Sequence, residues 1–170
     1  MNDTAPMLRV RRCAVIAALA LAMSGVCSHA MATITCSITS SAMSFGNYDP
    51  SGASATDGTG SVVVSCYHNS SGSNSVNITL AIGAGTYGTF AARKMQKSSG
   101  QQLSYNLYRD SARTQIWGTG SGGYSTVVIS TTISNNSSKS KTFTVYGRIP
   151  AQQNVPAGVY TDSVVITVTP

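Results

Sequence analysis

The chain has 170 residues, with 11 Lys or Arg against 5 Asp or Glu, and only 9% of its residues are charged. The cations are scattered, which excludes the clustered basic surface of a nucleic-acid-binding domain and removes nucleic acid from the expected partners. Soluble domains are usually about one quarter charged. With so few titratable groups, we expect no enzyme, no bound metal and no cofactor.

The first 32 residues have the pattern of a cleaved signal peptide. Arg9, Arg11 and Arg12 form a positive region, the apolar segment 13–23 follows, and Ala30-Met31-Ala32 supplies a cleavage site. The apolar segment is shorter than the roughly 20 residues that span a bilayer, so no transmembrane anchor is expected. Residues 33–170 are therefore predicted to form a single domain that is secreted through the periplasm to the cell surface.

Two cysteines, Cys36 and Cys66, remain after removal of this leader. In an oxidising compartment an even pair of cysteines is most simply a disulfide. Closing a loop of about 30 residues is expected to stabilise the fold by about 3.5 kcal/mol in the chain-entropy model.

Short β-branched runs bounded by Gly, Ser and Asn recur along the rest of the chain, which is typical of an all-β sandwich or barrel. In chain order, the predicted strands are Val62–Cys66, Val76–Ile82, Leu103–Leu107, Gln115–Trp117, Val127–Ile133, Lys141–Ile149 and Val159–Thr169. A helical turn is predicted only at Thr89–Met95. The polar segments Asn47–Ser61 and His68–Ser75 are predicted to be exposed loops, which makes His68 a surface residue.

The last predicted strand has its own pattern. Val164, Ile166 and Val168 recur at every second position up to Pro170. This period places the three side chains on one face of the strand. With no further strand to pair beside them, they are expected to form the edge of an open acceptor groove.

Two short motifs that fit catalytic signatures are interpreted as loops. Ser138–Lys141 fits S-x-x-K, but the K-T-G and S-D-N motifs that accompany it in serine acylases are absent from the sequence. Gly118–Gly123 fits G-x-G-x-x-G, but no helix is predicted after it, as a nucleotide site would require.

More specific segments are Phe45–Pro50, Gly60–Cys66, Leu103–Asp110, Trp117-Gly118, Tyr146–Ile149 and Gly158–Asp162. Their order and spacing across residues 33–170 resemble the spore coat protein U domain, a family that includes the pilins of archaic, Csu-type chaperone-usher pili. The matching motif residues, all expected to be structural, are Phe45, Gly46, Tyr48, Tyr105, Asn106, Tyr108, Arg109, Asp110, Gly158, Tyr160 and Asp162.

The resemblance implies an incomplete immunoglobulin-like β-sandwich that lacks a final strand and is completed by donor-strand addition. It implies a periplasmic chaperone, an outer-membrane usher and other pilin-like subunits as partners, with Cys36 and Cys66 as the family disulfide. The expected function is that of a secreted structural or adhesive subunit of a pilus or coat. The alternatives are a coat or matrix protein that does not polymerise, and a small secreted carbohydrate-binding module or hydrolase.

Position within a fibre depends on the segment ahead of the first strand. Cleavage after Ala32 leaves only Thr33, Ile34 and Thr35 before Cys36, about 10 Å of extended chain. A donor strand needs about five or six residues. We therefore expect a subunit that accepts a strand but donates none, at a fibre tip or as a terminal coat component. Cleavage nearer Gly25 is the alternative that would restore a donor.

Overall fold

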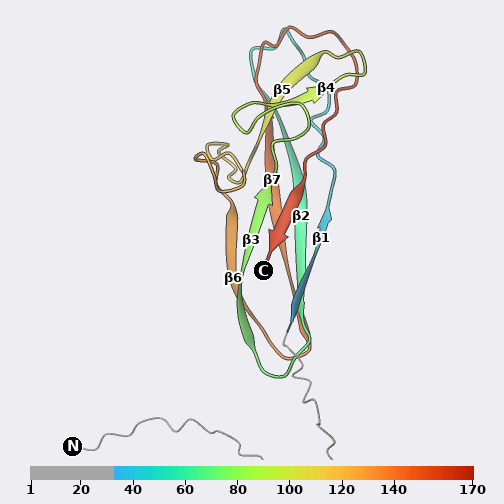
Figure 1. The fold of residues 1–170 in the computed structure, drawn as a ribbon. Helices are drawn as coiled ribbons and strands as arrows, with labels where there is room; N and C mark the ends of the chain where they lie inside the picture. The colour runs from blue at the N-terminus through green and yellow to red at the C-terminus, as the bar shows by residue number, and fades with distance from the viewer. Residues whose placement is uncertain (1–32) are drawn as a thin grey trace, which may run out of the picture.

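The computed structural model describes residues 33–170, which form strands joined by turns and loops (Figure 1). The predicted signal peptide, residues 1–32, lies outside the described residues. The strands are β1 (Ile34–Ser40), β2 (Thr56–His68), β3 (Asn74–Ile82), β4 (Arg93–Gln96), β5 (Gln102–Tyr108), β6 (Val127–Ile133), β7 (Ser137–Ile149) and β8 (Ile166–Thr169). Residues 33–170 contain no helix, and hence none of membrane-spanning length.

The strands form two antiparallel sheets whose inner faces share one core. One sheet has the order β1-β2-β7-β5-β4, and the other has the order β6-β3-β8. The buried apolar residues between them are Val62, Val64, Cys66, Ile78, Leu80, Ile82, Met95, Leu103, Tyr105, Leu107, Trp117, Ile133, Val145 and Ile149. This arrangement confirms the predicted all-β sandwich.

The two longest strands, β2 and β7, pair along their whole length, from Thr56 opposite Ile149 to His68 opposite Ser137. Both are longer than the sequence predicted, and the predicted loop Asn47–Ser61 is wrong from Thr56 onward. The added residues are mostly Ser, Thr, Gly and Lys. Such residues give little apolar periodicity, so these parts of the strands are specified by pairing with a neighbour and not by local composition.

Strand β4 replaces the helical turn predicted at Thr89–Met95, which is wrong. Arg93 and Met95 are both buried, so a period of two applies here. The predicted strand Val159–Thr169 is wrong in its first half, because Thr161 bridges to Gln96 of β4 and only β8 pairs with β3. Between these contacts the chain crosses from one sheet to the other.

Gln115–Trp117 is not a strand. Ile116 and Trp117 make only isolated bridges, to Tyr108 and Ser125 respectively. The short segment is held by the end of β5 and by the loop that follows it, which a search for periodic runs does not detect.

His68 is buried, with 1% of its surface exposed, and is not the surface residue that the sequence predicted. It ends β2 and continues the inward-facing series Val62, Val64 and Cys66. The alternation along β2 therefore outweighs the polar composition of the loop that begins after His68.

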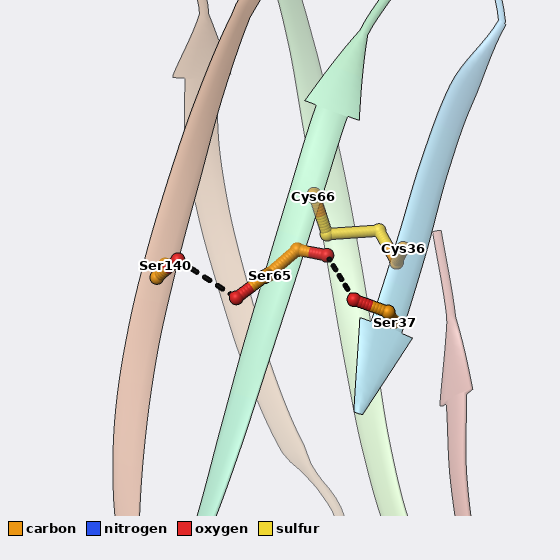
Figure 2. Close-up of a disulfide and its surroundings, with 5 residues drawn as sticks. All are labelled: Cys36, Ser37, Ser65, Cys66 and Ser140. Atoms are coloured by element: carbon orange, nitrogen blue, oxygen red, sulfur yellow. Dashed lines mark hydrogen bonds between the residues drawn. A yellow bond between two sulfur atoms is a disulfide. The ribbon is translucent and has the colours of Figure 1, made fainter. Parts of the chain in front are cut away.

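The predicted disulfide is confirmed, since Cys36 of β1 and Cys66 of β2 lie directly opposite each other and are bonded (Figure 2). Close to this bond, Ser65 contacts both neighbouring strands. Its carbonyl accepts a hydrogen bond from the Ser37 hydroxyl at 3.4 Å, and its hydroxyl lies 2.7 Å from that of Ser140. Strand β1 is thus joined to β2 by a covalent bond and a side-chain hydrogen bond as well as by its backbone ladder.

Candidate functional site

Two strand edges are left unpaired on the same side of the sandwich. Strand β1 pairs only with β2 at the end of one sheet, and β8 pairs only with β3 at the end of the other. The two strands are in contact, and Figure 1 shows them close together. Within residues 33–170, no strand pairs with the outer edge of either one.

The inward-facing side chains along these edges are only partly buried. They are Ile34, Cys36 and Ile38 of β1, Val164, and Ile166 and Val168 of β8. In the strands beside them the equivalent side chains are fully buried: Val64 of β2 is 2% exposed, and Leu80 and Ile82 of β3 are 0% and 1% exposed. The core is therefore open along the side where β1 and β8 meet.

Two cavities extend from this opening towards the end of the sandwich that carries β4 and β5. The first, of about 400 Å³, lies between Ser40–Phe45 and Tyr160–Ile166, over a floor that includes Val62, Leu107 and Val145. The second, of about 530 Å³, lies between residues 43–50 and 155–160. Because they share side chains at their junction, we refer to the two cavities together as the groove.

Paired glycines lie beneath one wall of the groove. Gly58 of β2 and Gly147 of β7 are directly opposite each other. A Cβ at Gly58 would stand 2.8 Å from the Ser44 carbonyl oxygen, and a Cβ at Gly147 would stand 2.6 Å from the Phe45 ring. Because both positions lack side chains, the segment after β1 packs directly on the sheet, and Phe45 meets Tyr105 edge to face at 5.9 Å.

Replacing Gly58 with alanine is expected to destabilise the domain by about 1–3 kcal/mol, because the Ser44 backbone must move away and take Phe45 with it. Gly60→Ala is the matched control on the same strand, since its Cβ would meet Met43 at an acceptable 3.4 Å. Urea unfolding followed by the fluorescence of Trp117, the only tryptophan in the chain, measures both variants. Equal losses would contradict a close approach at Gly58.

Asp162 fixes the wall of the groove opposite β1. Its carboxylate accepts hydrogen bonds from the Tyr105 hydroxyl at 2.7 Å and from the backbone N–H groups of Thr86 and Ser163, both at 2.8 Å. Burial raises the pKa of Tyr105 above its ordinary value, and the hydrogen bond to Asp162 raises it further. The phenol therefore stays protonated and is the donor in this hydrogen bond. Asp162 is the only charged side chain among the described residues that line the groove, and both of its oxygens are engaged.

Strand β4, which lines the groove, also carries a buried cation that the sequence did not single out. Arg93 is 0% exposed. Its Nη2 donates to the carbonyls of Gly83 and Trp117, each at 2.7 Å, and its Nη1 donates to Asn106 Oδ1 at 2.6 Å. The Asn106 amide in turn donates to the Phe90 carbonyl at 3.0 Å. Burial lowers the pKa of Arg93, while these oxygens solvate its charge.

Two motif tyrosines brace the loops around the second cavity. The Tyr48 hydroxyl donates to the Pro150 carbonyl at 3.1 Å and accepts from the Gln153 N–H at 2.7 Å. The Tyr160 hydroxyl donates to the Pro156 carbonyl at 2.8 Å. The hydroxyl groups of both tyrosines are therefore hydrogen-bonded, and both residues line the second cavity.

Two motif glycines, Gly46 and Gly158, lie in the loops around the second cavity. Gly46 has a φ of +70°, a conformation that favours glycine, in the turn after Phe45. Gly158 packs against the side chain of Lys97, where a Cβ would stand 2.5 Å from Cε. Both glycines line the second cavity.

Tyr108, Arg109 and Asp110 lie apart from the groove, at the end of β5 and in the turn that follows it. Asp110 accepts hydrogen bonds from the N–H groups of Thr114 and Gln115 at 3.0 and 2.8 Å. Arg109 Nε donates to the Gln115 amide oxygen at 2.6 Å. The predicted site residues thus divide between the groove wall, the loops around it and this separate turn.

The opposite side of the sandwich carries charge on its edge. Strand β5 pairs with β7 only from Tyr146 to Arg148, which leaves the earlier part of β7 unpaired on that side. There Lys139 and Lys141 lie opposite inward-facing residues of β2 and are exposed. Inward-pointing lysines prevent an edge from pairing with another strand. Strands β1 and β8 contain no charged residue, so the groove side lacks this protection.

These features define the class of the protein as an all-β sandwich whose core is incompletely covered by its own strands. The chain belongs to the spore coat protein U domain family, since residues 22–167 match the sequence model of the Spore Coat Protein U domain. It is 36% identical over 145 residues to Protein U of Myxococcus xanthus, a match that covers 79% of this chain and 76% of that protein.

A weaker structural similarity links the chain to the crystal structure of a chaperone–tip adhesion subunit pre-assembly complex from archaic chaperone-usher Csu pili of Acinetobacter baumannii. The TM-score is 0.48 and the sequence identity is 16%, with 80% of this chain covered. The match spans 39% of that other chain.

Proposed function

We propose that this protein is a non-catalytic surface subunit whose groove is filled by a β-strand from another protein chain. The observation that carries the proposal is the pair of free edges, β1 and β8, which are uncharged and lined with half-buried apolar side chains. An added strand would pair with the backbone groups of an edge and cover these side chains. It would also fill the cavity of about 400 Å³ beside them, which restores the packing density usual in protein cores.

Family membership supports an extension of the proposal to particular partners. A periplasmic chaperone would supply the strand first, an outer-membrane usher would mediate its exchange, and another pilin-like subunit would supply it in the assembled structure. The protein would then pass through the periplasm to the cell surface as a structural or adhesive component. If the leader is cleaved after Ala32, few residues precede β1, and we place the subunit at a tip or terminal position.

The description of the family as a spore coat domain favours a second candidate, a secreted coat protein that does not polymerise. The two candidates share the fold and differ in assembly. Electron microscopy of the secreted material distinguishes them, because fibres are expected for the first candidate and not for the second.

Strand acceptance is tested by supplying the strand within the same chain. A segment of alternating Val and Thr, fused after Pro170 through a short flexible linker, is expected to convert an aggregating protein into a soluble, cooperatively unfolding monomer. The control fusion carries Lys at the positions that face the groove, and it should not rescue solubility. Co-expression with the cognate chaperone should similarly give a soluble one-to-one complex.

A stable monomer without an added strand would contradict the proposal. If the protein without any fusion is a soluble monomer of high stability, and neither the added strand nor the chaperone raises that stability, the groove is not a strand acceptor.

A further inference from the structure

The two cavities of the groove meet at four side chains that line both: Met43, Phe45, Met95 and Tyr160. If a donor strand occupies the groove, as proposed above, its side chains pass this junction. Phe45 is seated over the glycine pair, Met95 is 8% exposed within β4, and Tyr160 is held through its hydroxyl. Ring packing, burial and a hydrogen bond, respectively, restrict the movement of these three side chains.

Met43 differs from the other three. Like Phe45 and Tyr160 it is outside any strand and only partly buried, but its side chain has neither a rigid ring nor a hydroxyl group. Its side chain lies over Gly147, with its Cβ facing Gly60, so it packs on positions that have no side chains. Methionine is unbranched and has three rotatable bonds, so it adapts to irregular spaces at low cost. Met43 can therefore change its rotamer without a movement of the sheet.

We propose that Met43 is an adjustable partition between the two cavities and determines which donor strand the groove prefers. A large apolar donor side chain at the junction displaces the Met43 side chain, joins the two cavities and packs between Met95 and Phe45. A small side chain leaves Met43 in place and buries less apolar surface. The preferred partner is an extended, uncharged segment with alternating apolar residues, one of which is as large as Phe and lies opposite Met43.

The side chains that line the groove predict that the donor side chains facing it are uncharged. The only charged side chain there among the described residues, Asp162, already accepts three hydrogen bonds. A donor Lys or Asp that faces the groove would be buried without a partner, which costs more than the lost apolar contact. Charge is therefore confined to donor positions that face solvent.

A peptide scan tests the proposal on the soluble complex of the full subunit with a weakly bound donor peptide. The competitors are peptides of about twelve residues, roughly 40 Å when extended, that alternate Val and Thr and carry one Phe in place of a different Val in each. One Phe position is expected to bind about tenfold more tightly than the all-Val peptide. Lys at the same position should bind at least about tenfold more weakly than Val.

Two substitutions of Met43 make the test specific. Met43→Ala should preserve or increase the preference for Phe, because no side chain has to be displaced. Met43→Trp should abolish it, because the indole occupies the junction. Val128→Ala, on the exposed outer face of β6, is the matched control and should leave the ratio unchanged.

The outcomes separate this proposal from the proposed function. If no peptide competes for the groove, strand acceptance itself fails. If peptides bind but no Phe position is preferred, or the preference survives Met43→Trp, the groove accepts strands and Met43 does not select them.

Discussion

Replacing Arg93 with alanine is expected to lower the free energy of unfolding by about 3–5 kcal/mol. The truncation leaves the carbonyls of Gly83 and Trp117 without the donor that Arg93 supplies, and the Asn106 amide oxygen keeps only its bond from the Leu107 N–H. Arg93→Lys should recover only part of the loss, because three donors on a single nitrogen cannot reproduce the planar fork of the guanidinium. Urea unfolding followed by Trp117 fluorescence measures the loss, because the indole is buried in the folded domain and is exposed to solvent on unfolding.

Lys94→Ala is the control for this prediction. Lys94 is the next residue of β4, is half-exposed and alternates with the buried positions, so its truncation should change stability by less than about 0.5 kcal/mol. A loss for Arg93→Ala no larger than that for Lys94→Ala would show that the guanidinium does not hold the loops together. Because Met95 lies on the same strand and lines the groove, Arg93→Ala is also expected to weaken donor binding.

The sequence predicted strands well in both sheets, and the predicted strand Leu103–Leu107 lies within β5 of the five-stranded sheet. Val127–Ile133 coincides with β6, and Val76–Ile82 lies within β3. Both strands have one face in the core and the other in solvent, so apolar and polar residues alternate along them. Strand β4 has only four residues, and one of its two inward side chains is an arginine. Burial of Arg93 depends on oxygens supplied by three other segments, which no local pattern reveals.

The same limit applies to the groove. The alternation of Val164, Ile166 and Val168 was visible in the sequence, and the structure shows all three side chains half-buried against the core. The glycine pair and Met43 could not be predicted, because they matter through contacts between distant segments. Gly147 lies about one hundred residues after Phe45, and the need for glycine there arises only when the two segments pack. Periodicity specifies the face of a strand but not the segment that packs on it.

Removing the disulfide is expected to lower the free energy of unfolding by about 3.5 kcal/mol. The bond between Cys36 and Cys66 joins residues 30 apart in the sequence, and its loss enlarges the ensemble of unfolded conformations. For Cys36→Ala/Cys66→Ala the urea midpoint should fall, and the dependence of stability on urea should steepen because the unfolded chain exposes more surface. Ser140→Ala, which removes only an exposed hydroxyl contact near the bond, should change stability by less than about 0.5 kcal/mol.

The same double variant shows whether the disulfide also acts in the folded state. Strand β1 pairs with a single neighbour and borders the open groove, so without the bond it is held by its backbone ladder, partial packing and the hydrogen bond from Ser37. We expect its amides to exchange with solvent faster in the double variant, and a bound donor strand to restore their protection by covering the outer side of β1. Faster exchange confined to β1 would show that the bond keeps the acceptor edge in position before a strand arrives. Equal exchange of the β1 amides with and without the bond would assign the whole loss of stability to the unfolded chain.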